Sequence, residues 1–465
     1  MTVLAVRMVP EREVSETNDH STNIAHIRNI KRCSAALVCV SLGVLTGPFL
    51  LARSAAATAR SPLAPFPAPN VDFIGLGNGS GLGMGQWGAF GYATLGHQPY
   101  RWILAHYYGR TTLSPGDNLV SRDPKISVDL NENDGDPVVV TSGSAFSFGG
   151  RSFLGGQAVR AVLSSGRWTL SDATGCSSTK WAHVASNLVN PVAVPSSVQP
   201  SATLNQVLTV CEGNGVDLAV RGTVEAYDSP RGAVTLSILP VEEYVRSVIS
   251  AEVSWSWGLF GGSDGSPQDH PWGFQALEAQ AVATRSYLAA EVASGGWAPY
   301  ATACDSYCQS YPGMANESPI LNAAVTDTAG QILEQPGTPG TPVFAEYSAS
   351  SGGYTGSGQF RGVVDRGDVV CIKSGYYTCN PCHKWWASVP VRSVEKTFPS
   401  VGKLAAVEVT QRNGLGSLGG RVETVEIVGT TGVKVSVSSY ALGSLLAENN
   451  PNYCASDWYA VTNGP

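Results

Sequence analysis

The chain has few charged residues, and no cluster of basic residues lies in its body. Its 465 residues include 29 Lys and Arg against 36 Asp and Glu, which gives a formal net charge of −7. Proteins that bind nucleic acid usually present a basic face to the phosphate backbone. We therefore expect no nucleic-acid partner, and an uncharged or mixed polymer fits the composition better.

The sequence also lacks an internal repeat period of the kind that indicates a solenoid. It contains 52 Gly and 28 Pro, which together with many Val, Thr and Ser favour short strands joined by turns. Apolar runs separated by Gly, Asn and Asp turns cover residues 125–240. These features predict a β-rich α+β protein with a few helices, and the length allows two or three domains or a single elaborated one.

One segment alone is long and apolar enough to cross a bilayer. Residues 33–57 are apolar, follow several basic residues and end in small side chains. This pattern predicts a signal peptide over 1–57 and a secreted or cell-wall-associated protein. The alternative is an uncleaved membrane anchor, since the apolar run is about as long as a membrane span.

Cysteine usage is consistent with export. Cys33 and Cys39 lie in the signal segment and leave eight cysteines, an even number that indicates disulfides in an exported chain. Sequence proximity favours the pairs Cys304 with Cys308 and Cys176 with Cys211. The remaining four then pair among themselves.

Two metal-based alternatives involve the same region of the chain. Cys379, Cys382 and His383 match the C-x-x-C-H pattern of covalent haem attachment. A c-type haem also needs a second axial ligand, and Met84 and Met314 are the only methionines after the signal. The second alternative is zinc, whose candidate ligands are Cys304, Cys308, Cys379, Cys382 and His383. We expect no cofactor, with zinc as the alternative.

The spacing of apolar residues predicts a helix over 240–254 that ends near Glu252. Pro240 suits a first helical turn, and Glu242 and Glu243 suit the positive end of the helix dipole. Glu252 continues the buried stripe, and a carboxyl group in apolar surroundings holds its proton near neutral pH and can act as a general acid. The alternative is that Glu252 caps the helix or forms a salt bridge. The stripe consists of Val241, Tyr244, Val245, Val248 and Ile249.

A Gly-rich segment over 75–109 becomes helical near Gln86. Phosphate binding is the alternative here, but no Lys-Ser or Lys-Thr signature accompanies the glycines. The glycines more plausibly allow close approach of the backbone to another element or to a sugar chain. The side chains that suit carbohydrate, or else a plain core, are Gln86, Trp87, His106, Tyr107 and Tyr108.

A second, Ala-rich helix is predicted over 271–293, opened by Asp269 and Pro271. Further along, Ser348, Ser351 and Thr355 raise the possibility of a serine hydrolase. The sequence has no G-x-S-x-G elbow, and hydroxyls near paired glycines are more often turn or ligand contacts.

Several strings in succession resemble the SpoIID/LytB family, which includes the sporulation glycan-cleaving protein, the amidase enhancer and actinobacterial relatives. LPVEEYVRSVISAEVS resembles the helix that leads into the family's site, with Glu252 at the catalytic glutamate. ALEAQAVATRSYLAA resembles the most recognisable run of the family and carries Gln280, Arg285 and Tyr287. CDSYCQSYPG, AVTDTAGQIL, AEYSASSGGYTG, HKWWASVPV and QRNGLGSLGGRVETVEIVG follow in the expected order. The resemblance covers about residues 72–460.

The Gly-rich segment usually follows the catalytic region in this family, whereas here it precedes it, as though the fold were permuted. We therefore expect 75–109 to fold against the Glu252 region, and Asp72 to lie near the C-terminal strands. The expected organisation is a signal peptide over 1–57, a Pro- and Ala-rich linker over 58–71 and a SpoIID/LytB-like domain over 72–465. Within this domain we distinguish the Gly-rich segment (72–124), the β-rich layer (125–239), a catalytic-type region (240–390) and the C-terminal strands (391–465).

The resemblance implies an exported cell-wall protein whose helices pack around a glycan-binding groove and bind peptidoglycan glycan strands. The implied activity is that of a lytic transglycosylase, in which Glu252 acts first as acid and then as base. The alternative is a non-catalytic wall-binding protein that enhances an amidase partner. Expected substrate contacts are Gln86, Gln280, Arg285, Tyr287, Tyr311, Ser348 and Ser351.

Overall fold

The computed structural model describes residues 62–114, 122–212, 217–373 and 378–464. These residues belong to one compact unit that extends from Arg60 to Pro465. The predicted signal peptide over 1–57 lies outside the described residues. Within the described part of the chain, no helix has the length and apolar character needed to span a membrane.

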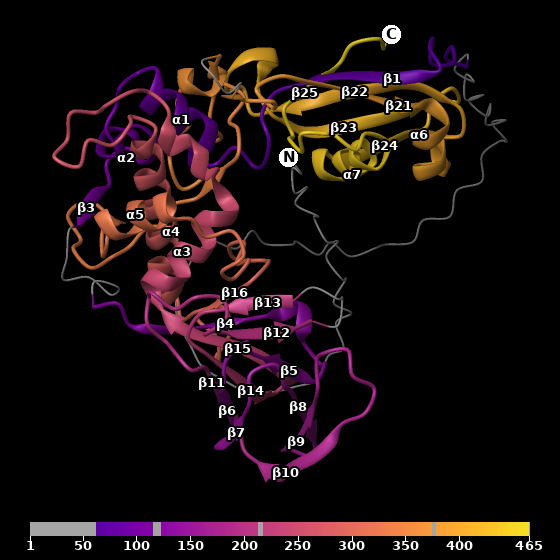
Figure 1. Ribbon diagram of the computed structural model, residues 1–465. Helices are drawn as coiled ribbons and strands as arrows, with labels where there is room; N and C mark the ends of the chain where they lie inside the picture. Colours follow the sequence, from indigo (N-terminus) through magenta and orange to yellow (C-terminus); the bar gives the residue numbers. More distant parts are fainter. Residues whose placement is uncertain (1–61, 115–121, 213–216, 374–377, 465) are drawn as a thin grey trace, which may run out of the picture. The chain divides into compact units, whose positions relative to one another are not determined.

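Two antiparallel sheets form the β-rich layer predicted over 125–239, and their inner faces share one hydrophobic core (Figure 1). The six-stranded sheet has the order β10 (Ala182–Leu188), β9 (Arg167–Ala173), β8 (Ala158–Ser164), β5 (Val138–Thr141), β12 (Leu208–Cys211) and β13 (Asp217–Val220). The seven-stranded sheet has the order β16 (Ala303–Cys304), β4 (Lys125–Asp129), β15 (Gly232–Pro240), β14 (Thr223–Ser229), β11 (Val192–Val194), β6 (Phe146–Phe148) and β7 (Arg151–Phe153). The β16 strand pairs with β4 in parallel, and the other pairs are antiparallel.

The helices pack around α4, which is buried along most of its length. Its many alanines allow neighbouring helices to approach on several sides, and a helix that is apolar all round belongs in a core. Contacts with α4 are made by α1, α2, α3 and α5 (Figure 1). The bounds are α1 (Gln86–Thr94), α2 (Tyr100–Tyr108), α3 (Val241–Glu252), α4 (Phe274–Ala293) and α5 (Pro319–Asp327).

The two helices expected around 240–254 and 271–293 are therefore confirmed, with small differences at their starts. Pro240 ends β15 and stands just before α3 instead of inside its first turn. The buried stripe of α3 is also confirmed, since its five apolar residues are completely buried. Three pairs of short strands form separate two-stranded sheets: β2 (Met84–Gly85) with β18 (Tyr347–Ser348), β3 (Thr112–Ser114) with β17 (Ile332–Glu334), and β19 (Cys371–Ile372) with β20 (Thr378–Cys379).

The C-terminal part has a hydrophobic core of its own, to which the start of the described chain contributes. Asp72 donates its backbone N–H to Asn463 Oδ1 at 2.8 Å, which confirms that Asp72 lies near the C-terminal strands. The central strand β1 pairs with β21 and β25 on its two sides (Figure 1). The bounds here are β1 (Asn70–Gly75), β21 (Trp385–Pro390), β25 (Tyr459–Val461), β22 (Leu404–Arg412), β23 (Val422–Gly429), β24 (Lys434–Ser438), α6 (Val391–Thr397) and α7 (Ser439–Asn449). Single 3-10 turns are η1 (Asn131–Asn133), η2 (Trp255–Leu259), η3 (Arg366–Val369), η4 (Pro399–Val401) and η5 (Ser417–Gly419).

The linker expected up to residue 71 is packed against this C-terminal core in its described part. Phe66 and Val71 are buried, and the Phe66 N–H donates to the carbonyl of Leu404 at 2.8 Å. The described part of the expected linker is thus packed on the protein and not free of it. Composition shows that a Pro-rich segment has little to bury, but it does not show that a nearby surface takes up the few apolar side chains present.

Four disulfides join the eight cysteines, as predicted from their even number. Cys176 pairs with Cys211 and Cys304 with Cys308, which confirms both local pairs. The other four form Cys371–Cys379 and Cys382–Cys454. The cysteines named for zinc or haem are thus bonded to other cysteines in this structure, and a disulfide sulfur is not the thiolate that zinc binds.

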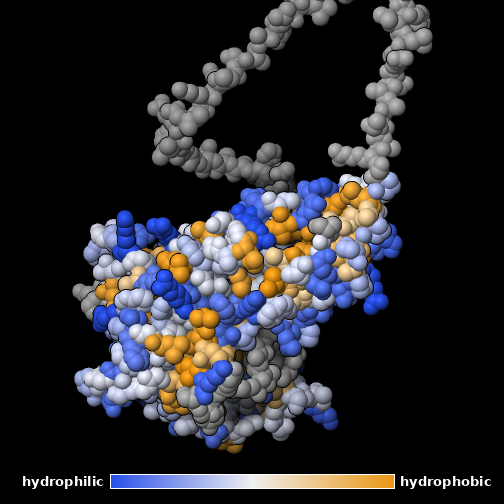
Figure 2. Space-filling model, turned by 90° about the horizontal axis from the view of Figure 1, so that it is seen from above, coloured by the Kyte–Doolittle hydropathy of each residue, from blue (hydrophilic) through white to orange (hydrophobic). Residues whose placement is uncertain are grey.

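The face shown in Figure 2 carries small apolar patches separated by hydrophilic residues. Single exposed apolar side chains are common on folded proteins and need no explanation of their own. An exposed aromatic ring therefore gains functional meaning from its position. Trp255 is 52% exposed just after α3, and Trp386 is 68% exposed on β21.

Candidate functional site

Glu252 is the last residue of α3 and is half-buried, with its carboxyl group enclosed by neighbouring side chains. Gln86 donates its side-chain N–H to Glu252 Oε2 at 3.0 Å. Burial raises the pKa of Glu252 above its usual value, while hydrogen bonds from Gln86 and from the backbone of Ser310 partly oppose this shift. The carboxyl group therefore keeps its proton to higher pH than an exposed glutamate does.

The alternative of a salt-bridged Glu252 is not what the structure shows. Among the described residues, its hydrogen-bond partners are all neutral: the Gln86 amide, the Ser310 backbone N–H and the Tyr347 hydroxyl. Neutral partners stabilise the carboxylate less than a cation would, so the effect of burial dominates and the pKa of Glu252 is raised.

The Gly-rich segment delivers Gln86 to this carboxyl group, as predicted. Strand β2 pairs in parallel with β18, and the Met84 N–H donates to the carbonyl of Glu346 at 3.0 Å. Gly83 has a φ of +63°, and a Cβ there would lie 1.8 Å from the Glu346 carbonyl oxygen. The glycine is required because any side chain would separate the two segments. Helix α1 then begins at Gln86, which is 4% exposed.

Gln280 lies directly behind Gln86. The Gln86 amide donates to Gln280 Oε1 at 3.4 Å, and the Gln280 amide donates in turn to Thr284 Oγ1 at 3.2 Å. Both Gln280 and Thr284 are completely buried on α4. Gln280 thus orients the amide that contacts Glu252 and has no exposed group with which to meet a substrate.

Two further residues at this site, Gln309 and Tyr347, were not predicted from the sequence. The Tyr347 hydroxyl faces Glu252 and donates its proton to Gln309 Oε1 at 2.7 Å. The Gln309 amide donates to the carbonyl of Thr284 at 3.4 Å, and a carbonyl can only accept, so the orientation of Gln309 is fixed. With its single proton engaged, the Tyr347 oxygen keeps lone pairs that can accept the proton of a neutral Glu252. Both residues lie in strings that carried the family resemblance, but no spacing rule singled them out.

Arg285 lies elsewhere and does not line a surface. Its guanidinium is completely buried and makes two hydrogen bonds to Glu242, at 2.9 Å and 2.7 Å. A further N–H donates to the carbonyl of Gln331 at 3.1 Å. Glu242 stands at the other end of α3 from Glu252, about 15 Å along the helix axis. The expectation of a substrate contact is corrected, because Arg285 holds α3 to α4.

Tyr311 is also a core residue. Its ring stacks on Tyr244 at 5.6 Å between centroids, and its hydroxyl lies 3.2 Å from Ser237 Oγ. It is 3% exposed, and burial raises its pKa well above the usual value. The expected groove contact is corrected, since the ring is buried against Tyr244. Tyr107 and Tyr108 are likewise buried in the core.

The predicted serines divide into two cases. Ser348 pairs with Gly85 next to Gln86, and its buried hydroxyl has no hydrogen-bond partner among the described residues. Ser351 is completely buried and donates to Asp365 Oδ2 at 2.7 Å, so the expected substrate contact is corrected.

Tyr287 is half-buried and packs edge-on against Phe344, with part of its ring open to a surface hollow.

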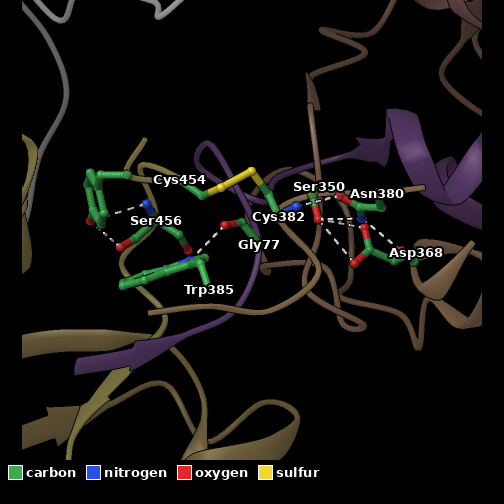
Figure 3. Close-up of a disulfide and its surroundings, with 9 residues drawn as sticks. Gly77, Ser350, Asp368, Asn380, Cys382, Trp385, Cys454 and Ser456 are labelled. Carbon is green, nitrogen blue, oxygen red and sulfur yellow. Dashed lines mark hydrogen bonds between the residues drawn. A yellow bond between two sulfur atoms is a disulfide. The ribbon is translucent and has the colours of Figure 1, made fainter. Parts of the chain in front are cut away.

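A buried polar network fixes the segment that follows Ser348 (Figure 3). The Ser350 hydroxyl donates to Asp368 at 2.8 Å and accepts from the Asn380 amide at 3.0 Å. His383, a candidate metal ligand from the sequence, places Nδ1 2.8 Å from Asp368 Oδ2. The Cys382–Cys454 disulfide lies next to this network and joins it to the C-terminal core (Figure 3). Sequence gave no signal for Asp368, whose importance depends on these distant partners.

The described residues contain one group of three potential metal ligands, Cys176, Cys211 and Asp217. Its two cysteines are bonded to each other. The group lies in the β-rich layer and shares no residue with the Glu252 site.

The site therefore consists of one half-buried glutamic acid with a raised pKa, oriented by a buried amide, which is the arrangement expected of a protein that uses a single general acid. The family model for SpoIID, Stage II sporulation protein, matches residues 231–334. The chain carries a SpoIID domain, and the predicted SpoIID/LytB family, which is linked to cell-wall degradation, is confirmed. Neither a curated protein nor a solved structure matches the chain. The matched range contains Glu252 and Gln280, whereas Gln86 and Tyr347 lie outside it.

Proposed function

We propose that this protein is exported, binds the glycan strands of peptidoglycan and cleaves them as a lytic transglycosylase, with Glu252 as the only catalytic carboxyl group. The observation that carries the proposal is the Glu252 carboxyl, whose pKa is raised by burial and which accepts a hydrogen bond from Gln86 at 3.0 Å. A general acid must hold a proton at the working pH and be fixed in position; the raised pKa of Glu252 favours the first requirement, and its hydrogen bond from Gln86 supports the second.

In the proposed reaction the Glu252 proton passes to the glycosidic oxygen as the bond from that oxygen to C1 breaks. The 6-hydroxyl oxygen of the same sugar attacks C1 and closes a 1,6-anhydro ring, and its proton returns to the Glu252 carboxylate. The new bond joins C1 to the 6-hydroxyl oxygen of the same sugar, so no water molecule is consumed. Gln86 orients the carboxyl group in both steps and helps to stabilise the carboxylate that exists between them.

A single carboxyl group is sufficient for this reaction because the substrate supplies its own nucleophile. A hydrolase would require a second carboxylate at a set distance. The groups that affect the pKa of Glu252 are Gln86, Ser310 and Tyr347, and none of them is a carboxylate. This supports the transglycosylase over a two-carboxylate hydrolase.

The test is Glu252→Gln, which keeps the shape of the side chain and removes its proton donor. We expect cleavage of glycan strands without stem peptides to fall by about 10²- to 10⁴-fold, measured as anhydro products by mass spectrometry. Glu291→Gln is the matched control, because burial raises the pKa of Glu291 to about 7 and it too is half-buried. Activity of Glu252→Gln within a few-fold of the wild type would remove Glu252 from the mechanism. A wild-type protein that binds glycan without cleaving it would instead support the amidase enhancer.

A further inference from the structure

We infer that Asp365 is a positioning residue for the Glu252 site. Its buried carboxyl group fixes the start of α1 and the segment 347–351, which carry Gln86 and Tyr347 to Glu252. Asp365 acts through these two segments, so it is not itself a catalytic residue. As a statement about catalysis, the inference rests on the proposed function.

One face of α1 is made of glycines, and the segment that contains Asp365 packs directly against it. Gly85 stands just before α1, and Gly88 and Gly91 follow at a spacing of three residues, which places them on one side of the helix. A Cβ on Gly91 would lie 2.1 Å from the Gly367 carbonyl oxygen, and a Cβ on Gly88 would lie 2.2 Å from Asp365 Oδ2. Because no side chain separates the two segments, the position of α1 depends closely on the position of the Asp365 segment.

The Asp365 carboxyl group lies at the first turn of this helix. A Cβ on Gly85 would be 2.6 Å from Asp365 Oδ2, and Gly85 directly precedes Gln86. The Tyr107 hydroxyl faces the same carboxyl group over Gly88, where a Cβ would be 2.1 Å from the hydroxyl oxygen. Asp365 is 2% exposed and cannot meet a substrate directly. Any effect of this carboxyl group on the site must therefore pass through the segments packed against it.

Ser351 connects the Asp365 carboxyl group to the segment that carries Tyr347. The Ser351 hydroxyl donates to Asp365 Oδ2 at 2.7 Å. Just before Ser351, the Ala349 carbonyl accepts a hydrogen bond from the Trp87 N–H, in the first turn of α1, at 3.0 Å. Asp365 therefore contacts both of the segments that meet at the site.

A second buried carboxyl group, that of Asp368, stands next to Asp365. Asp368 is completely buried and accepts hydrogen bonds from the Ser350 hydroxyl, the Ser351 N–H and His383 Nδ1 at 2.8 Å, 2.9 Å and 2.8 Å (Figure 3). Burial and the neighbouring charge of Asp368 raise the pKa of Asp365, so the pair holds a proton where two exposed aspartates would hold none. In this state Asp365 acts as a neutral hydrogen-bonding group, which an asparagine can imitate.

The experiment compares Asp365→Ala with Asp365→Asn. The alanine removes the carboxyl group, and we expect kcat for glycan cleavage to fall about tenfold with unchanged KM. A displaced Gln86 stabilises the Glu252 carboxylate less, so the alkaline limb of the pH profile should move up by as much as about one pH unit. The asparagine keeps the size of the side chain and an acceptor oxygen, and should restore most of the kcat and the position of the limb. Asp129→Ala is the matched control and should leave the limb in place, since Asp129 is also completely buried and faces a second carboxyl group, that of Asp134, within the β-rich layer.

Two measurements separate positioning from a general loss of stability. In the double variant Asp365→Ala with Gln86→Leu, the alkaline limb should lie where Gln86→Leu alone places it, because both changes remove the same interaction. An NMR titration of isotope-labelled glutamate carboxyl groups should show a higher pKa for Glu252 in Asp365→Ala, with the Glu252 signal identified by its loss in Glu252→Gln. This titration requires no cleavage. Ser351→Ala removes only the hydroxyl bond to Asp365 and should move the pKa of Glu252 in the same direction, so it replaces Asp365→Ala if that variant does not fold.

The outcomes distinguish the inference from the proposed function. A folded Asp365→Ala with the alkaline limb and the Glu252 pKa of the wild type overturns the inference, while loss of activity in Glu252→Gln still supports the proposed function. Limb displacements that add in the double variant also overturn the inference. A wild type that does not cleave glycan, together with a Glu252 pKa that rises in Asp365→Ala, overturns the proposed function and leaves the positioning role of Asp365 standing.

Discussion

Replacing Gln86 by Leu tests whether this amide controls the protonation of Glu252. The Gln86 N–H donates to Glu252 at 3.0 Å, and donation to a carboxylate stabilises its charged form and lowers its pKa. Leu has a similar volume and no donor, so the substitution should raise the pKa of Glu252 further. Hydrogen bonds to charged groups contribute about 1.5–3 kcal/mol, and the lower value corresponds to about one pKa unit.

The assay is the rate of glycan cleavage as a function of pH. Activity requires protonated Glu252 and falls as the pH rises through its pKa, so the alkaline limb in Gln86→Leu should move up by about one pH unit. At acid pH, where both proteins carry the proton, the rate should still be lower by about tenfold, because the carboxyl group is less well oriented. Gln157→Leu is the matched control, since that half-buried amide donates to Asp172 at the same distance, 3.0 Å, within the β-rich layer. An alkaline limb that stays in place or moves to lower pH in folded Gln86→Leu would refute the reasoning.

Three further predictions concern stability and redox state. Arg285→Met should lower the free energy of unfolding by about 3 kcal/mol, because it leaves Glu242 without its buried partner. It should not change the KM for glycan in the folded protein, and an altered KM at unchanged stability would contradict the structural role. Burial raises the pKa of Glu278 to about 8, so between about pH 5 and pH 9 the folded protein keeps a proton on this group that the unfolded chain releases. The contribution of Glu278 to the free energy of unfolding is therefore fully present at acid pH and is lost as the pH rises through this range. Urea unfolding at a series of pH values should therefore show a flatter pH dependence for Glu278→Gln than for the wild type, and identical pH dependence in the two proteins would count against the shift. Thiol titration of the mature protein, unfolded without reductant, should find almost no free thiols among its eight cysteines, whereas four or more free thiols with stoichiometric zinc would favour the metal alternative.

Much of what the sequence predicted correctly is local. The stripe from Val241 to Ile249 identified α3 and its buried face, because a helix places residues three and four apart on one side whatever surrounds it. The local disulfides, Cys304–Cys308 and Cys176–Cys211, were predictable because short separations keep the two partners near each other. The meeting of Gln86 and Glu252 is long-range, and it was anticipated from the family resemblance and not from the spacing.

The roles of the other site residues depended on partners that spacing does not reveal. Arg285 and Gln280 stand on the same helix and looked equally suited to a groove, yet Arg285 pairs with Glu242 while Gln280 supports Gln86. Gln309 and Tyr347 join the site through hydrogen bonds between segments far apart in the chain. Periodicity in a sequence determines which side of an element is buried, because local geometry repeats. Which polar group meets which inside the protein was decided only by the tertiary structure, since a buried donor binds whichever acceptor the packing of distant segments brings within reach.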